Sequence, residues 1–234
     1  MLLSMHIPKT AGMSLRTAFE KRFGNALLLA YPRVDWAQSL FPLGSRKSLD
    51  EQGQESVLAL CRQRDVQCIH GHFPMPALQS LFPEAMCITF LRDPVQRVIS
   101  SYDHKVRKSE WAKTGQGPTY MAPGFSERMS FESFISAPDM RNVYEQFGVL
   151  DCLESLTFIG LTEQYERSLR LLERRVPGLG PLSCEKVNVH EKYFRRDDVT
   201  PEMMARVREL NDADVQIYEA ARDWFEAACA ASGI

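Results

Sequence analysis

Residues 86–106, MCITFLRDPVQRVISSYDHKV, contain the clearest change from strand to helix in the chain. The apolar run Met86–Leu91 predicts a buried strand. Asp93 and Pro94 follow it at once and are residue types favoured at the N-cap and first turn of a helix. Helical spacing then continues in the apolar residues, which are Val95, Val98, Ile99, Tyr102 and Val106. The stretch therefore predicts a strand that leads directly into a helix.

Similar strand and helix patterns alternate through the rest of the chain. Strands are expected at residues 2–7, 66–70 and 156–161, and residues 26–31 form a further apolar run. Helices are expected at about 15–23, 54–64, 163–174, 200–210 and 217–228. Gly24 has the residue type that commonly ends a helix. This alternation predicts an α/β fold with a mainly parallel central sheet. With 234 residues and no obvious linker, we expect one domain over residues 1–234.

The composition excludes several classes of protein. Hydrophobic residues make up 44% and charged residues 25%, which is typical of a globular chain and not of a disordered chain, a collagen or a coiled coil. A net charge of −2 argues against a dedicated nucleic-acid binder. We find no apolar run long enough for a membrane span and no signal peptide. The six cysteines are therefore expected to be reduced and mostly buried, and the protein to be cytoplasmic.

The loop after the first expected strand has the features of an anion-binding site. It lies within residues 6–15, HIPKTAGMSL, where Lys9 supplies a charge and Thr10 and Ser14 supply hydroxyl groups. Gly12 lets backbone N–H groups approach a ligand at the start of a helix. The lysine precedes the glycine, so this is not the GxxxxGK[ST] loop of nucleoside triphosphatases. An ordinary turn with a solvated lysine remains the alternative.

A second anion contact is expected at the end of the strand Met86–Leu91. Arg92 can bind a phosphate through its planar guanidinium, and Ser100 lies about two helical turns further on. We interpret Asp93 as a helix cap and Arg97 as a surface residue in an ion pair.

Together, the segments HIPKTAGMSL and FLRDPVQRVISSYDH resemble the two nucleotide-binding segments of sulfotransferases that use 3′-phosphoadenosine 5′-phosphosulfate (PAPS). The resemblance is strongest to the carbohydrate branch, which includes heparan sulfate 2-O-sulfotransferase. FIGLTEQYERSL at 158–169 and, more loosely, Asn188 extend it. It implies a P-loop-like three-layer fold. It also implies binding of the 5′-phosphosulfate by Lys9, Thr10, Ala11, Gly12, Met13 and Ser14, and of the 3′-phosphate by Arg92 and Ser100.

Met13 departs from that family pattern, because a small polar residue is common at its position. The residues that bind adenine find no match in this sequence.

His70-Gly71-His72 follows an apolar strand and supplies the candidate base. Residues i and i+2 of an extended segment point to one side, so both imidazoles can face one site, and Gly71 leaves room for a ligand. Histidine titrates near neutral pH, which suits proton transfer. The resemblance implies that His72 is the base and that His70 supports it, with Lys9 stabilising the leaving group. No metal is expected.

The other histidines and Glu163 have weaker claims. His104 follows Arg92 on the same helix and is a candidate substrate contact. His6 is expected to be buried behind the loop and His190 to be exposed. Glu163 suits the start of a helix, and a catalytic role is the alternative.

The acceptor is the least defined part of the prediction. From about Trp111 to Arg128 we expect a loop. The wider stretch Lys105–Arg128 mixes cationic and aromatic residues that could bind an acidic sugar chain, and a solvated loop is the alternative.

The predicted function is transfer of a sulfuryl group from PAPS to a hydroxyl, on a carbohydrate by preference, with 3′,5′-ADP as product. Two other functions are considered: a nucleotide- or phosphate-binding module without catalysis, and a P-loop kinase that uses ATP. The sequence does not indicate an oligomeric state.

Overall fold

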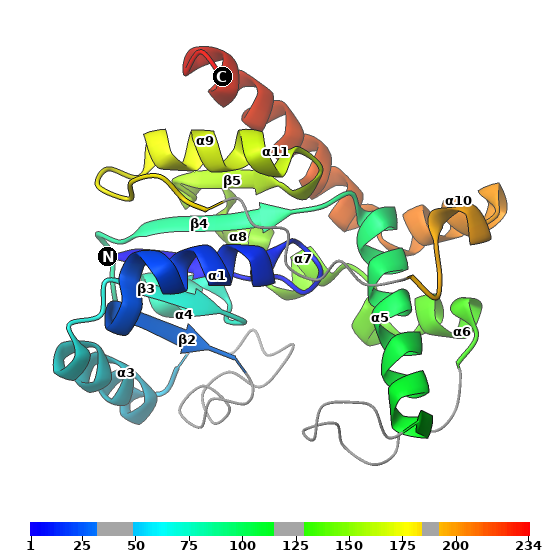
Figure 1. Ribbon diagram of the computed structural model, residues 1–234, viewed down its shortest axis with the longest axis horizontal. Helices are drawn as coiled ribbons and strands as arrows, with labels where there is room; N and C mark the ends of the chain where they lie inside the picture. Colours follow the sequence, from blue (N-terminus) through cyan, green and yellow to red (C-terminus); the bar gives the residue numbers. More distant parts are fainter. Residues whose placement is uncertain (32–48, 115–128, 184–191) are drawn as a thin grey trace.

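The computed structural model describes residues 1–31, 49–114, 129–183 and 192–234. Its centre is a parallel sheet in the order β2-β3-β1-β4-β5, and Figure 1 shows the arrows of all the strands pointing toward the side on which α5 lies. The strands are β1 Leu2–Met5, β2 Leu27–Ala30, β3 Cys68–Gly71, β4 Met86–Leu91 and β5 Phe158–Leu161. The predicted α/β fold with a parallel sheet is confirmed.

Helices connect the strands and cover both faces of the sheet. Those seen in the described part of the chain are α1 Gly12–Phe23, α3 Glu51–Arg64, α4 Met75–Gln79, α5 Pro94–Thr114, α6 Phe131–Ser136, α7 Val143–Gln146, α8 Val149–Cys152, α9 Tyr165–Arg175, α10 Pro201–Leu210 and α11 Asp212–Ala231. Short 3₁₀ turns are η1 Gly24–Ala26, η2 Pro138–Met140, η3 Leu153–Ser155, η4 Thr162–Gln164 and η5 Arg196–Asp198. The long helices agree with the sequence pattern, whereas α4 and α6–α8 were not predicted because they are too short to show a period.

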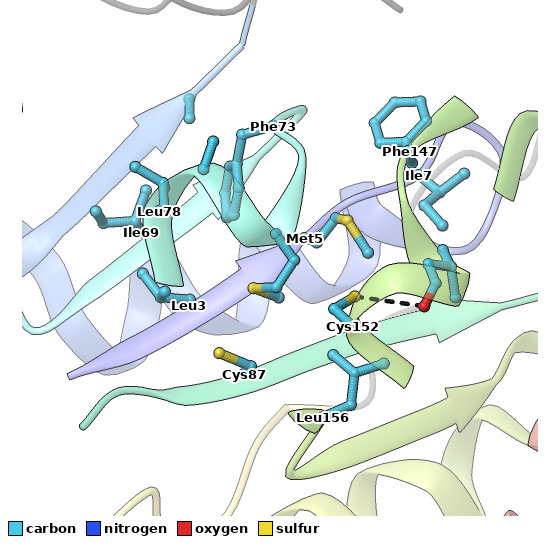
Figure 2. Packing of buried hydrophobic residues seen from close by; sticks show 14 of the residues in the cluster. Leu3, Met5, Ile7, Ile69, Phe73, Leu78, Cys87, Phe147, Cys152 and Leu156 are labelled. Carbon is cyan, nitrogen blue, oxygen red and sulfur yellow. Dashed lines mark hydrogen bonds between the residues drawn. The ribbon is translucent and has the colours of Figure 1, made fainter. Parts of the chain in front are cut away.

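Side chains that alternate along the strands form a separate core on each face of the sheet. Leu3, Met5 and Ile69 pack with α3, α4, α7 and α8, as Figure 2 shows for part of this cluster. Leu2 and Ile88 point to the other face and pack with α1, α9 and α11. The result is the predicted three-layer arrangement of helices, sheet and helices.

A third apolar cluster lies beyond the carboxyl ends of the strands. It joins α5, α6 and α10 through the buried side chains of Val98, Tyr102, Phe134 and Val207. The longest helix of this cluster is α5, which continues to Thr114. The prediction of a loop from about Trp111 is therefore wrong for its first residues, and the stretch Lys105–Arg128 begins as a helix. Residues 115–128 lie outside the described part of the chain.

Five cysteines are free and buried in the structure, as predicted. Burial raises the pKa of Cys61 and of Cys87 to about 11, so both are neutral thiols at neutral pH. Cys184 lies outside the described residues. Within the described residues, no helix has the length and apolar character needed to cross a membrane.

Candidate functional site

The carboxyl ends of the three central strands bring the predicted site residues to one edge of the sheet. β1 lies between β3 and β4. Lys9 follows β1, His72 follows β3 and Arg92 follows β4. Because these strands are parallel, the loops that carry the three residues are neighbours, which is where ligands bind in open α/β sheets.

The loop after β1 is bent into a cradle by two residues with positive φ. Lys9 has φ 74° and Ala11 has φ 63°, although neither is glycine. Such left-handed residues turn successive backbone N–H groups toward one point, and α1 then begins at Gly12 with its own N–H groups facing the same way. The loop thus has the shape of an anion-binding site, and its strain is compatible with a functional role.

Gly12 is required by packing. A Cβ at this position would lie 1.9 Å from the imidazole of His6. His6 is buried, as predicted, and its Nδ1 lies 2.9 Å from the hydroxyl of Tyr31. The His6 ring therefore packs against the loop, and only a glycine at position 12 leaves enough room for this ring.

Lys9 is surrounded by other cations. Its pKa falls to about 8 because the side chain is largely buried and because Arg107, Arg92 and Lys108 lie nearby. The carboxylate of Asp103 only partly opposes this shift. A lysine that loses part of its charge in the free protein gains it again when an anion binds beside it.

Thr10 and Met13 differ in how they could contribute to the predicted nucleotide site. The hydroxyl of Thr10 donates to the carbonyl of Ile7 at 2.9 Å and is buried, so its proton already serves the loop. The side chain of Met13 is 41% exposed at the start of α1. Ser14 continues the same helix turn, with its N–H bonded to the carbonyl of Ala11.

Arg92 lies directly against the loop. Its Nη1 donates to the carbonyl of Lys9 at 3.4 Å, and its side chain is about a quarter exposed. The guanidinium of Arg92, after β4, thus contacts the backbone of the loop after β1, and its charge contributes to the lowered pKa of Lys9. Ser100 lies further along α5 and is partly buried.

His70 and His72 both contact His6, but their environments differ. The rings of His70 and His6 are stacked 5.5 Å apart, and those of His72 and His6 lie 4.6 Å apart. His70 is fully buried, with Nδ1 2.9 Å from Ser4 Oγ and Nε2 3.3 Å from the Gly12 carbonyl. Because that carbonyl accepts only, Nε2 carries the proton and Ser4 donates to Nδ1. His70 therefore holds the loop.

His72 is partly exposed and has the opposite tautomer. Its Nδ1 donates to the carbonyl of His6 at 2.5 Å, which leaves the lone pair on Nε2. Burial lowers its pKa below the usual value, so the ring is neutral at neutral pH. Burial also lowers the pKa of His70 to about 3. Of the two, His72 has the nitrogen suited to accept a proton.

Gly71 serves the sheet and not a ligand. A Cβ there would lie 2.0 Å from the carbonyl oxygen of Ala30 on β2, and the N–H of His72 donates to the same carbonyl at 2.6 Å. The expectation that Gly71 leaves room for a ligand is therefore corrected: the neighbouring strand fills that space.

The α5 side chains near Lys9 extend the positive region. His104 has its pKa lowered to about 3 by burial and by Lys9, Lys108 and Arg107, so it is neutral at neutral pH. Asp103 binds Arg107 at 2.5 Å and accepts the N–H groups of Tyr193 and Phe194 at 2.8 and 3.1 Å. It thus ties the segment after residue 191 to α5.

The carboxylates of Asp93 and Glu163 both accept backbone hydrogen bonds at the start of α5. Asp93 Oδ1 accepts the N–H of Gln96 at 2.9 Å and caps α5, as predicted. Glu163 accepts the N–H of Asp93 at 2.9 Å and the hydroxyl proton of Tyr218 at 3.1 Å. The carboxylate of Glu163 therefore holds the start of α5.

Arg97 is not the surface residue that the sequence predicted. Its side chain is only 2% exposed and faces the buried carboxylate of Asp214 on α11 at 3.8 Å. A partner more than a hundred positions away in sequence gives no local signal, so this pair could not be predicted. The same holds for Ser4, Tyr31 and Tyr144, which support the site from strands and a short helix.

Asn188 and His190 lie outside the described residues. Within the described residues, no three His, Cys, Asp or Glu side chains are arranged to hold a metal ion. The His6 ring is stacked on that of His70 and tilted against that of His72.

The site thus combines a loop with the shape of an anion-binding site, an arginine beside it and a histidine with a lone pair on Nε2. A family model described as the sulfotransferase family matches residues 1–219. The chain belongs to the sulfotransferase family.

Two individual proteins show how far the similarity reaches. Heparan-sulfate 6-O-sulfotransferase 2 of Danio rerio is 27% identical over 179 residues, which cover 59% of this chain and 37% of that protein. The chain therefore spans well under half the length of this curated relative. The crystal structure of a sulfotransferase from Alicyclobacillus acidocaldarius superposes with a TM-score of 0.51 over 94% of both chains at 16% identity, which supports the shared fold.

Proposed function

We propose that this protein transfers the sulfuryl group of PAPS to a hydroxyl group of a carbohydrate and releases 3′,5′-ADP. The observation that carries the proposal is the contact of the Arg92 guanidinium with the backbone carbonyl of Lys9, which joins the loops after two neighbouring parallel strands. Family membership supports sulfuryl transfer, and the name of the Danio rerio relative supports a sugar acceptor.

The residues present fit a ligand with two anionic groups. The strained loop from Lys9 to Ala11 and the start of α1 offer backbone N–H groups to one of them. Arg92 offers a guanidinium to the other. In this reading Lys9 and the loop bind the 5′-phosphosulfate, and Arg92 with Ser100 binds the 3′-phosphate.

The chain's own groups then divide the work of transfer. Lys9 neutralises charge on the leaving oxygen, which is an electrostatic contribution to catalysis. His72 Nε2 takes the proton of the acceptor hydroxyl, because its lone pair is free and its ring is neutral. Ser4 and His70 hold the loop in place through Gly12. His104, Arg107 and Lys108 lie near Lys9 and offer contacts to an acidic sugar.

The experiment that tests the proposal offers PAPS and heparan-type oligosaccharides to the purified protein and measures formation of 3′,5′-ADP and of sulfated sugar. His72→Ala should lower kcat by roughly 10²–10⁴ and leave the Kd for 3′,5′-ADP unchanged. His104→Ala is the comparison, because it removes a nearby neutral imidazole that the mechanism does not use as a base. As a sugar contact, His104 should affect the KM for the oligosaccharide and leave kcat within the same order of magnitude.

The pH profile gives a second check on His72. Because the pKa of His72 is lowered below 6.5, kcat should rise with pH below that value and stay level around neutral pH. It should fall again as Lys9 loses its charge above about pH 8. A protein that binds 3′,5′-ADP but forms no sulfated product with any hydroxyl acceptor would be a binding module. Stabilisation by ATP and Mg²⁺ but not by 3′,5′-ADP would favour a kinase. Location in the cytoplasm and a single domain stay predictions of the sequence.

A further inference from the structure

The backbone at the end of β4 is held by side chains from other elements. The hydroxyl of Thr162 donates to the carbonyl of Leu91 at 2.9 Å. The hydroxyl of Tyr144 accepts the N–H of Arg92 at 3.0 Å and donates to the carbonyl of the same residue. The carboxylate of Glu163 accepts the N–H of Asp93 at 2.9 Å. Side chains therefore bind the backbone of three consecutive residues, 91–93.

Such fixation matters because this is the point where the chain leaves the sheet. Backbone groups beyond a strand end have lost their partners in the ladder and need others. A hydroxyl that binds both the N–H and the C=O of one residue sets the orientation of the two peptide groups on either side of its Cα. It therefore sets the direction in which the Arg92 side chain leaves the backbone.

Tyr144 is itself held rigidly. Its side chain is fully buried, and its N–H donates to Asp214 Oδ1 at 2.9 Å. The guanidinium of Arg97 lies 5.7 Å from the centre of its ring. Burial strongly raises the pKa of Tyr144, so the hydroxyl keeps its proton at neutral pH and can donate it. The hydroxyl is thus a fixed point against which Arg92 is placed.

We propose that Tyr144 is the positioning residue for Arg92 and, through it, sets the protein's preference for nucleotides that carry a second phosphate. This inference rests on the proposed function, in which Arg92 binds the 3′-phosphate. Thr162 contributes less to the position of Arg92, because its hydroxyl binds the carbonyl of Leu91, the residue before Arg92.

The test compares the affinities for 3′,5′-ADP and 5′-AMP by calorimetry in Tyr144→Phe and wild type. The substitution removes only the hydroxyl group. A lost hydrogen bond and an unpaired peptide should weaken 3′,5′-ADP binding about tenfold and 5′-AMP binding less than twofold. Tyr102→Phe is the matched control: its buried hydroxyl donates to the carbonyl of Met129 at 2.7 Å, and neither affinity should change.

A second comparison shows whether Tyr144 acts through Arg92. In an Arg92→Ala background, Tyr144→Phe should change neither affinity further, because the side chain that it places is gone. If circular dichroism shows that Tyr144→Phe is unfolded, Thr162→Val replaces it. This variant should lower the ratio of the 3′,5′-ADP affinity to the 5′-AMP affinity about threefold.

Three results would overturn the inference. They are an unchanged ratio of the two affinities in a folded Tyr144→Phe protein, an equal loss for both nucleotides, and a further loss in the Arg92→Ala background. A wild-type protein that binds 5′-AMP as tightly as 3′,5′-ADP contradicts the proposed function itself, because Arg92 then reads no second phosphate.

Discussion

Replacing Lys9 by arginine tests whether the crowding of cations around the loop controls nucleotide binding. Burial and the neighbouring Arg107 and Arg92 lower the pKa of Lys9 to about 8. About nine-tenths of the side chains are then charged at pH 7, and about one-tenth at pH 9. Arginine stays charged over this whole range.

The sign of the effect follows from the charge of the ligand. Only the protonated lysine attracts a phosphate, so the Kd for 3′,5′-ADP should rise as pH increases through 8. Between pH 7 and pH 9 the rise should be about tenfold, or about 1.4 kcal/mol, which does not exceed the roughly 1.5–3 kcal/mol that a charge-assisted contact contributes. Lys9→Arg should bind with a Kd that does not depend on pH in this range.

Calorimetry at pH 7, 8 and 9 measures this directly. His104 does not interfere, because its pKa is lowered to about 3 and the ring is neutral throughout. The reasoning would be refuted by a wild-type Kd that is constant from pH 7 to pH 9, or by a Lys9→Arg protein with the same pH dependence as wild type.

Three further substitutions test the support of the site. Gly12→Ala should lower the free energy of unfolding by about 1–3 kcal/mol, because the added methyl group collides with His6; an unchanged thermal midpoint would contradict this packing. Arg97→Ala should lower the free energy of unfolding by about 3–5 kcal/mol, since it leaves the buried carboxylate of Asp214 without its cation. Urea titration measures this loss, and a value below about 1 kcal/mol would contradict a stabilising role for the pair. Ser4→Ala should cost about 1 kcal/mol by removing one buried hydrogen bond, and a more stable variant would exclude that bond.

The sequence predicted the elements that show a period over a sufficient length. Met86–Leu91 was predicted with its observed bounds, because a fully buried strand is apolar throughout. The helix after it was placed correctly at its start, since Asp93 and Pro94 have local signals. Its end was predicted too early, because polar residues continue a helix without an apolar pattern.

The part of the site that directly follows strands was also predicted, because the strands have a local sequence pattern. Lys9 and Arg92 follow strands, so the fold class alone places them at one edge of the sheet. The support of these residues depends on contacts between distant segments. No local sequence pattern indicates these contacts. They are the hydrogen bonds of the Tyr144 hydroxyl with Arg92 and of the Ser4 hydroxyl with His70, and the burial of Arg97 against α11.

The order β3-β1-β4 gives the proposed reaction a direction across the sheet. In the proposed reaction, a nucleotide held by Lys9 and Arg92 extends from β1 toward β4 and leaves the β3 side, where His72 lies, to the incoming hydroxyl. In-line displacement needs the attacking and leaving oxygens on opposite sides of the transferred group, and we expect this order of strands to favour that arrangement. The helix α5 would then serve both partners, because it carries Ser100 for the nucleotide and His104, Arg107 and Lys108 for the sugar. Substitutions on α5 should therefore affect donor and acceptor together, whereas a substitution of His72 should affect only the acceptor.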